Sequence, residues 1–231
     1  MTTTRYVYIP KTKDVGVMLR EIQFDWYPGF SILQKQKSIR SLHDNIRALG
    51  IQNILEVSSK SENELGVHLS AFNMFFTTKK FGRQISVESA FQGSKVFDRG
   101  GPLTDLYSKT PIEAKKDERL QNLGNIIGFR FFEYNFDTKP RTLFYDWLYI
   151  NALSQNKKAL EEIIKYEAFT DIEFNPAKSI NCQAYSVALA VSLLKNGLFE
   201  RALMSLDMFK KVMKEEYIKQ DTNRKIQLKL I

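Results

Sequence analysis

The first quarter of the chain alternates between strand-like and helix-like patterns. Residues 4–9 and 16–26 are rich in β-branched and aromatic residues and flank a turn-forming stretch, which predicts a pair of short strands. Residues 31–50 place apolar side chains at helical spacing and end at a glycine, which predicts a helix. We therefore predict an accessory N-terminal subdomain over residues 1–56 and a core with a basic C-terminal helix over residues 57–231.

The remainder of the chain is dominated by helical patterns. Apolar residues at helical spacing, with proline starts and glycine ends, predict helices over residues 86–97, 103–108, 111–124, 140–155, 158–168, 179–198 and 199–220. A turn and an extended piece are predicted over residues 61–73, and two short strands over residues 74–85. Further short extended segments are predicted over residues 53–59, 126–136 and 170–176. Because the strands are few, short and scattered, we predict a mainly α, multihelical fold with a few short β-strands, and an α+β fold is the second choice.

Composition places few limits beyond those of an ordinary folded protein. The chain has 231 residues, of which 43% are hydrophobic and 26% charged, and no apolar run approaches the roughly 20 residues that span a bilayer. Its first ten residues lack the basic and apolar regions of a signal peptide. Cys182 is the single cysteine, and His43 and His68 are not spaced as a ligand pair. We expect a cytoplasmic protein without a metal site, a cofactor or a membrane partner.

The net charge of +8 and the isoelectric point near 9.4 are compatible with an anionic partner. Residues 210–231 hold seven Lys or Arg against three Asp or Glu, so this segment carries about half of the excess. The segment is either a solvated terminal helix or a tail that binds nucleic acid or a protein. The sequence leaves both interpretations open.

A polar stripe runs along the helix predicted for residues 86–97. Glu88, Gln92 and Lys95 are spaced i, i+4 and i+7, so they share one face, and Phe91 falls on the opposite side. Glu88 and Lys95 are two turns apart, roughly 10 Å along the axis, which is too far for a simple ion pair and about the width of a sugar. The stripe is therefore either a solvated surface or a place where a sugar binds.

Other residues are candidates for substrate contact by their type. Lys115 and Arg119 lie on little more than one helical turn and could hold a pyrophosphate, although the acidic residues among them also fit a solvated charged face. Trp147 could stack on a base or pack in the core. Glu173 lies in an irregular segment and is a candidate for ribose binding. Polar residues in such segments also stabilise turns, which is the alternative.

Standard hydrolase and nucleotide-binding signatures such as G-x-S-x-G, the Walker loop and H-E-x-x-H do not occur in the chain. A different resemblance is carried by LSAFN at residues 69–73 and FGRQISVESAFQGSKVF at residues 81–97. Together they resemble the opening of the NADAR family, whose most specific pattern is valine–glutamate–x–x–phenylalanine–glutamine–x–x–lysine. EAKKDERL at residues 113–120 resembles a later family segment, with Glu118 where glycine is usual. The resemblance covers roughly residues 66–190.

Segments outside the general family pattern narrow the resemblance. The N-terminal portion and AFTDIEFNPAKSINCQAYS at residues 168–186 resemble the subfamily associated with DarT-type toxins, which ADP-ribosylate DNA bases. The resemblance implies a mainly helical fold and an N-glycosidase that removes ADP-ribose from guanine bases in DNA, acting as an antitoxin. It implies two partners, ADP-ribosylated DNA and a DarT-type toxin encoded nearby, and no cofactor.

The resemblance also implies catalytic roles that fit the chemistry. Cleaving a base–ribose bond passes through an oxocarbenium-like state, which needs a nucleophile at the anomeric carbon and an acid for the departing base. Lys95 is the expected nucleophile, since a neutral lysine can attack this carbon and open the sugar to a Schiff base. Glu88 is the expected proton shuttle or charge stabiliser, and Gln92 is expected to orient the ribose hydroxyls.

The remaining matched residues are expected to bind substrate. They are Asn73, Lys115, Arg119, Trp147 and Glu173; the two cations would meet the pyrophosphate and the tryptophan would stack on a base. Two other functions stay open. One is an N-glycosidase acting on intermediates of the riboflavin pathway, and the other is a protein that binds a toxin or ADP-ribosylated DNA without cleaving it. A toxin gene nearby, or rescue by catalytic amounts of protein, would favour the antitoxin enzyme.

Overall fold

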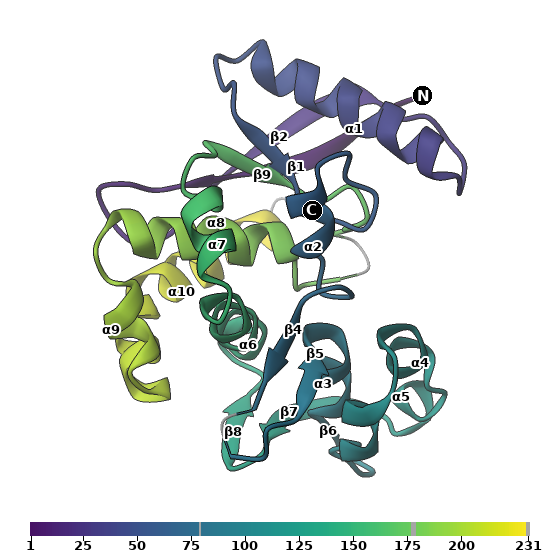
Figure 1. Ribbon diagram of the computed structural model, residues 1–231, viewed down its shortest axis with the longest axis vertical. Coiled ribbons are helices and arrows are strands. Elements are labelled where there is room, and N and C mark those ends of the chain that lie inside the picture. The colour runs from purple at the N-terminus through teal and green to yellow at the C-terminus, as the bar shows by residue number, and fades with distance from the viewer. Residues whose placement is uncertain (79, 177–178, 230–231) are drawn as a thin grey trace.

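The computed structural model describes residues 1–78, 80–176 and 179–229. Helix accounts for 44% of the structure and strand for 20%, and the described strands form three sheets (Figure 1). The fold is therefore α+β. The prediction of a mainly α fold is wrong, and the second choice is the observed class.

Several strands pair with partners that are distant in sequence. The strands are β1 (Thr2–Pro10), β2 (Val17–Asp25), β3 (Ile54–Glu56), β4 (Phe75–Thr77), β5 (Gln84–Ser86), β6 (Lys95–Phe97), β7 (Ile126–Phe131), β8 (Tyr134–Asp137) and β9 (Ala168–Thr170). The sheets have the orders β2–β1–β9–β3, β4–β5 and β6–β7–β8. Sequence patterns report local propensity and not distant pairing, which is why the mainly α prediction understated the sheets.

The helices follow most of the predicted segments and differ mainly at their ends. They are α1 (Ile32–Arg47), α2 (Glu64–His68), α3 (Val87–Gly93), α4 (Pro111–Lys116), α5 (Arg119–Asn122), α6 (Leu143–Ser154), α7 (Lys157–Ile163), α8 (Gln183–Lys195), α9 (Phe199–Leu203) and α10 (Leu206–Lys229), with a 3₁₀ helix η1 (Thr104–Ser108). The extended piece predicted within residues 61–73 is wrong, because Asn63 caps α2 by accepting from the amide of Leu65.

The N-terminal layer is a β-hairpin covered by α1, as the sequence predicts (Figure 1). Its buried apolar side chains are Val7, Ile22, Phe24, Ile39, Leu42, Ile46, Ile54, Ala168 and Ile172. β9 lies between β1 and β3, so Phe169 faces Tyr8 on one side and Leu55 on the other. This layer is thereby joined to later parts of the chain, and the predicted boundary at residue 56 stays a prediction.

The main core is built around α6 and α8. Asp146 on α6 is only 1% exposed and accepts hydrogen bonds from Ser186 on α8 at 2.7 Å and from Tyr217 on α10 at 3.1 Å. Burial raises the pKa of Asp146 to about 7, against the opposing effect of these hydrogen bonds. Phe209 and Met213 of α10 are fully buried, so one face of the first half of the basic terminal helix packs into the core, while Lys210, Lys211 and Lys214 on it are exposed.

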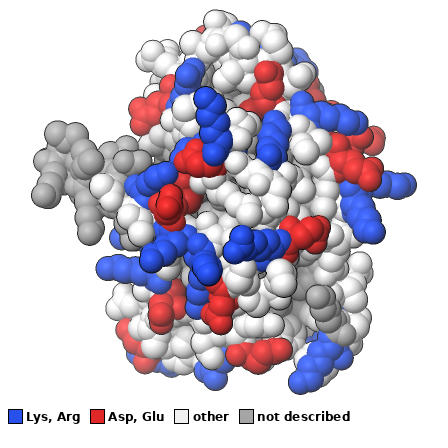
Figure 2. All heavy atoms as spheres, turned by 90° about the vertical axis from the view of Figure 1, so that its left-hand side faces the viewer, with Lys and Arg blue, Asp and Glu red and all other residues white. Residues whose placement is uncertain are grey.

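The described surface shows no single basic patch on the face drawn in Figure 2, where lysine and arginine side chains lie among aspartate and glutamate. No helix in the described part of the chain has the length and apolar character needed to cross a membrane. Among the same residues, no group of three or more His, Cys, Asp or Glu side chains is placed to hold a metal ion.

Candidate active site

Helix α3 lies in the interior of the protein, and hydrogen bonds fix its start. Ser86 caps the helix by accepting from the amide of Ser89 at 3.0 Å. The amide of Glu88 donates to the carbonyl of Ala71 at 3.0 Å, which ties the helix to the loop after α2. All seven residues of α3 are buried. A polar side chain on this helix therefore meets a protected interior instead of bulk water.

The helix ends at Gly93, two residues before Lys95. A Cβ atom at Gly93 would lie 2.6 Å from a ring carbon of Tyr107, so glycine is what lets this ring pack against the helix. The chain then extends into β6, where Lys95 pairs with Phe129 of β7. The prediction of a helix through Phe97 is therefore wrong at its end, because pairing with β7 replaces the last helical turn.

A continuous chain of hydrogen bonds joins the three residues of the polar stripe. The Gln92 amide donates from Nε2 to Glu88 Oε1 at 2.8 Å, and Lys95 Nζ donates to Gln92 Oε1 at 2.5 Å. Glu88 is 6% exposed and Gln92 is 7% exposed, so the stripe is not a solvated surface. The Gln92 amide donates to the Glu88 carboxylate and accepts from the Lys95 amine, so it lies between these two groups and fixes their positions.

The amine of Lys95 has an unusual electrostatic environment. Burial lowers the pKa of Lys95 to about 8; the Glu88 carboxylate opposes this shift and the Lys115 ammonium adds to it. At pH 7 about one Lys95 in ten is then neutral, against fewer than about one in a thousand for an ordinary lysine. Lys95 Nζ also lies 5.0 Å from the centre of the Phe91 ring. The sequence placed Phe91 on the opposite side, because it assumed that the helix continues to Lys95.

Lys115 forms the more exposed edge of this cluster. Its Nζ lies 3.7 Å from Glu88 Oε1 and 4.8 Å above the ring of Phe72, while its side chain is 55% exposed. The basic segment that the sequence singled out thus reaches the buried carboxylate from α4. Neither Phe72 nor Phe91 was named as a functional residue, although both lie inside the two segments that carry the family resemblance.

Arg119 lies outside the cluster and is engaged by two carboxylates. Its Nη2 is 2.6 Å from Asp105 Oδ2 and 2.8 Å from Asp117 Oδ2, and its Nε donates to Asp117 Oδ1 at 2.8 Å. These partners raise the pKa of Arg119 above its already high ordinary value. A phosphate would have to displace carboxylates to use this guanidinium.

Trp147 lies on α6 and packs among other aromatic rings. Its ring centroid is 5.1 Å from that of Tyr134 and 5.2 Å from that of Phe136, and the residue is 8% exposed. Little of its surface is free to stack on a base. Of the two uses that the sequence left open for Trp147, the structure shows core packing.

Asn73 and Glu173 also make contacts elsewhere. The exposed Asn73 donates from Nδ2 to the carbonyl of Val67 at 2.9 Å, which holds the loop before β4. The Glu173 carboxylate lies 2.9 Å from Lys35 Nζ on α1. Of the eight residues expected from the sequence, the structure thus brings together Glu88, Gln92, Lys95 and Lys115, and the contacts of the other four lie outside this cluster.

Comparison with models of known protein families gives one match. A family model described as the DarT1-associated NADAR antitoxin matches residues 3–223. The chain belongs to this family. The match includes the N-terminal hairpin, and it indicates an antitoxin of a DarT system. The wider NADAR family is known for N-glycosidase activity. No curated protein matches the chain.

Proposed function

We propose that this protein is an N-glycosidase that removes ADP-ribose from ADP-ribosylated guanine bases in DNA, and that it thereby reverses the action of a DarT-type toxin. The observation that supports this most is the buried chain Glu88–Gln92–Lys95, in which burial lowers the pKa of the lysine to about 8. An amine in this state is partly neutral near neutral pH and can act as a nucleophile. Family membership supports the antitoxin role.

The reaction begins with the neutral amine of Lys95. Its nitrogen attacks the anomeric carbon of the ribose, the bond from that carbon to guanine breaks, and guanine leaves with a proton. The ring then opens to a Schiff base between the sugar and Lys95. Water adds to the Schiff base, which releases ADP-ribose and restores the free amine.

Glu88 and Gln92 support this step from fixed positions. Glu88 carries the proton between the amine and the departing guanine, or it steadies the positive charge that develops on the sugar. Gln92 orients the ribose hydroxyls when the substrate replaces one of its present hydrogen bonds. Lys115, half exposed at the edge of the cluster, meets the pyrophosphate as a point charge.

The other four expected contacts require rearrangement to serve the substrate. Arg119 binds a phosphate only if it releases its ion pairs with Asp105 and Asp117. Trp147 stacks on a base only if the aromatic rings around it move. Asn73 and Glu173 contact the ribose only after leaving Val67 and Lys35, respectively. We therefore expect these residues to contribute less than the cluster around α3.

The test is incubation of the protein with single-stranded DNA carrying ADP-ribosylated guanine, followed by mass spectrometry of the released product. Release of more than one ADP-ribose per protein molecule is expected. Borohydride added during turnover is expected to leave ADP-ribose attached to Lys95, because it reduces the Schiff base. Protection of DNA only at a one-to-one ratio with the toxin, without released ADP-ribose, would mean sequestration and would overturn the proposal.

The role of Glu88 has its own test. Glu88→Gln keeps the side chain's shape and its contact with Gln92 but removes the group that carries the proton. Turnover is expected to fall by about 100-fold or more while substrate affinity changes little. A change in affinity alone would show that Glu88 binds substrate and does not move a proton.

A further inference from the structure

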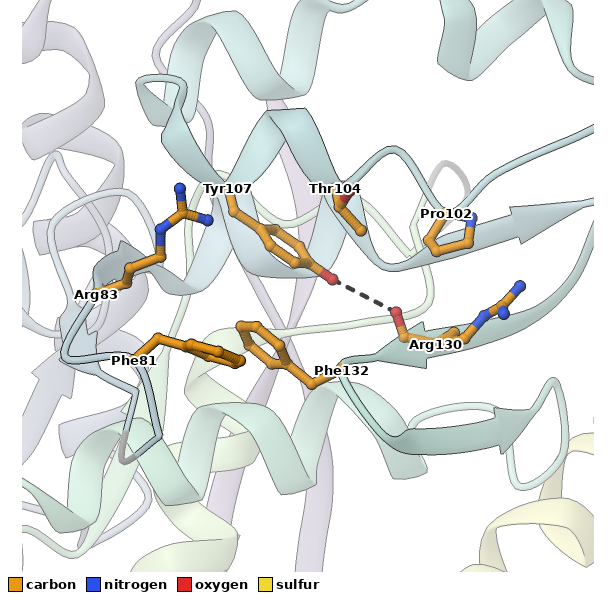
Figure 3. Close-up of a pocket in the computed structure, with 7 residues that line it drawn as sticks. All are labelled: Phe81, Arg83, Pro102, Thr104, Tyr107, Arg130 and Phe132. Carbon is orange, nitrogen blue, oxygen red and sulfur yellow. Dashed lines mark hydrogen bonds between the residues drawn. The ribbon is translucent and has the colours of Figure 1, made fainter.

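A cleft of about 640 Å³ lies beside the β6–β7 strand pair and is separate from the Glu88–Gln92–Lys95 cluster. Its lining residues are Phe81, Arg83, Pro102, Thr104, Tyr107, Arg130 and Phe132 (Figure 3). Phe129 pairs with Lys95 in the sheet, and Arg130 is the next residue along β7, so its side chain points to the opposite face. The cleft and the candidate nucleophile therefore share a strand pair.

The floor of the cleft touches the residue next to Lys95. Tyr107 Oη lies 2.9 Å from Ser94 Oγ and donates to the carbonyl of Arg130 at 3.4 Å. Ser94 directly precedes Lys95 in the chain. The cleft and the Lys95 amine lie on opposite faces of the strand pair, and β6 is an edge strand of its sheet, so a long substrate with one residue at Lys95 reaches this cleft by passing around that edge.

Two phenylalanine rings form a platform in the cleft. Phe81 stacks on Phe132 with ring centroids 5.6 Å apart and an angle of 28° between the planes, and Phe81 is 55% exposed. Phe132 has a backbone φ of 51°, in the left-handed region that favours glycine. A large residue held in this conformation, with its ring against an exposed partner, is typical of a binding surface.

Two arginines flank the platform. In Figure 3, Arg83 lies at one end of the rings and Arg130 at the other, and both are exposed. Within the described residues neither guanidinium has an ion pair, whereas Arg40, Arg47 and Arg119 each pair with a carboxylate. No Asp or Glu is among the seven lining residues.

We propose that this cleft binds the nucleotides that flank the modified guanine in a single DNA strand, with bases stacked on Phe81 and Phe132 and phosphates on Arg83 and Arg130. Exposed rings with cations beside them are the usual means of holding single-stranded nucleic acid. A DNA strand carries phosphates on both sides of each base, which fits cations at both ends of the platform. ADP-ribose carries phosphates on one side of its adenine only. The choice of DNA rests on the proposed function.

The first test measures binding without turnover. The fluorescence anisotropy of an unmodified single-stranded oligonucleotide of about 12 nucleotides is titrated at several salt concentrations. Arg83→Ala and Arg130→Ala are each expected to lower the slope of log Kd against log salt by about 0.7. Phe81→Ala is expected to weaken binding by about 10-fold with little change of slope. Wild-type affinity and slope in all three variants would overturn the proposal.

Matched controls come from exposed residues elsewhere on the chain. Arg20→Ala on β2 removes the same charge, and Phe30→Ala removes a ring that is fully exposed. Both are expected to bind DNA within about twofold of the wild type. If Arg20→Ala lowered the salt slope as much as the cleft variants, binding would reflect net charge and the cleft would not be the site.

The second test separates the DNA strand from the adenosine end of ADP-ribose. ADP-ribose release is compared between ADP-ribosylated guanosine and the same modification in single-stranded DNA. The cleft variants are expected to lower the ratio of kcat/KM for DNA over the nucleoside by about 10-fold. An equal loss on both substrates would place ADP-ribose itself in the cleft and overturn the proposal. If the wild type released no ADP-ribose at all, the proposed function would fail, while the anisotropy result would still decide the cleft.

Discussion

Two buried polar clusters in this protein resemble each other in composition and differ in their surroundings. One is Glu88–Gln92–Lys95 beside α3. The other joins α1, β3 and β9: Thr170 Oγ1 donates to Glu56 Oε2 at 2.6 Å, and His43 Nε2 lies 2.8 Å from the same hydroxyl. A hydroxyl has one hydrogen, which goes to Glu56, so the oxygen accepts from His43 Nε2–H. Burial lowers the pKa of His43 to about 4, which keeps the imidazole neutral at pH 7.

The two clusters differ in how far they are exposed to solvent. The α3 cluster ends at the half-exposed Lys115 and contains an amine with a lowered pKa. The Glu56 cluster is at most 7% exposed, and its carboxylate also accepts from the amide of Ile172 at 2.8 Å. Burial of polar groups is common to both and therefore does not mark a functional site. A route to solvent and a partly neutral nucleophile distinguish the first cluster, and closed hydrogen bonding between distant elements marks the second as structural.

The largest effect is expected from Lys95→Ala. Release of ADP-ribose from modified DNA falls by about 1,000-fold or more, because the attacking amine is gone. Single-turnover assays with excess protein measure the loss, and circular dichroism checks that the fold is retained. A variant that still released ADP-ribose at the wild-type rate would remove the distinction between the two clusters.

Glu56→Ala is expected to act on stability instead of chemistry. The change leaves the Thr170 hydroxyl and the Ile172 amide buried without their acceptor, so the free energy of unfolding falls by about 3 kcal/mol. Urea unfolding measures this loss. Activity per folded molecule is expected to stay unchanged, and a specific loss of turnover in the folded variant would contradict the structural role.

His43 offers a test of the same cluster through pH. Burial lowers the pKa of His43 to about 4 in the folded protein, while an unfolded histidine takes up a proton near pH 6.5. Between these values the unfolded chain binds more protons, so this contribution to stability is lost as pH falls from about 6.5 to 4. The stability of the His43→Gln variant is expected to fall by about 3 kcal/mol less than that of the wild type between pH 7 and 4. Parallel stability curves would contradict a buried neutral imidazole.

The smallest effect is expected from Lys115→Met. The wild-type kcat should rise with pH, with a midpoint near pH 8 and a plateau about one pH unit higher, as Lys95 loses its proton. Because the Lys115 ammonium lowers the pKa of Lys95, its removal moves the midpoint up by about half a pH unit and lowers kcat at pH 7 by about threefold. The control is Lys116→Met, an exposed neighbour on α4. An unchanged midpoint would show that Lys115 does not act on the amine.

The part of the site that the sequence predicts is the part set by local spacing. Glu88 and Gln92 are one helical turn apart, and this spacing survives in α3. The position of the Lys95 amine over Phe91 depends on where the helix ends, and Tyr107 packing against Gly93 sets that end. Gly93 and Tyr107 are 14 residues apart, and the periodicity of apolar residues within one helix does not predict a contact over that separation.

The same limit explains the fold class. The hairpin over β1 and β2 is local and was predicted, whereas β9 joins strands more than 100 residues away. Of the two basic residues predicted to bind substrate, one reaches the candidate site and the other does not. Lys115 lies close to the buried carboxylate of Glu88. Arg119 pairs instead with Asp105 of η1, a contact that the sequence pattern did not predict.

The place of β9 between β1 and β3 also governs the order of events while the chain is being made. The hairpin and β3 leave the ribosome first, and the strand that fills the gap between them follows only after more than 100 further residues. Until then β1 and β3 present open edges, which other chains can pair with. The antitoxin therefore completes this sheet only once β9 has been made, and a nascent chain halted before β9 cannot close it.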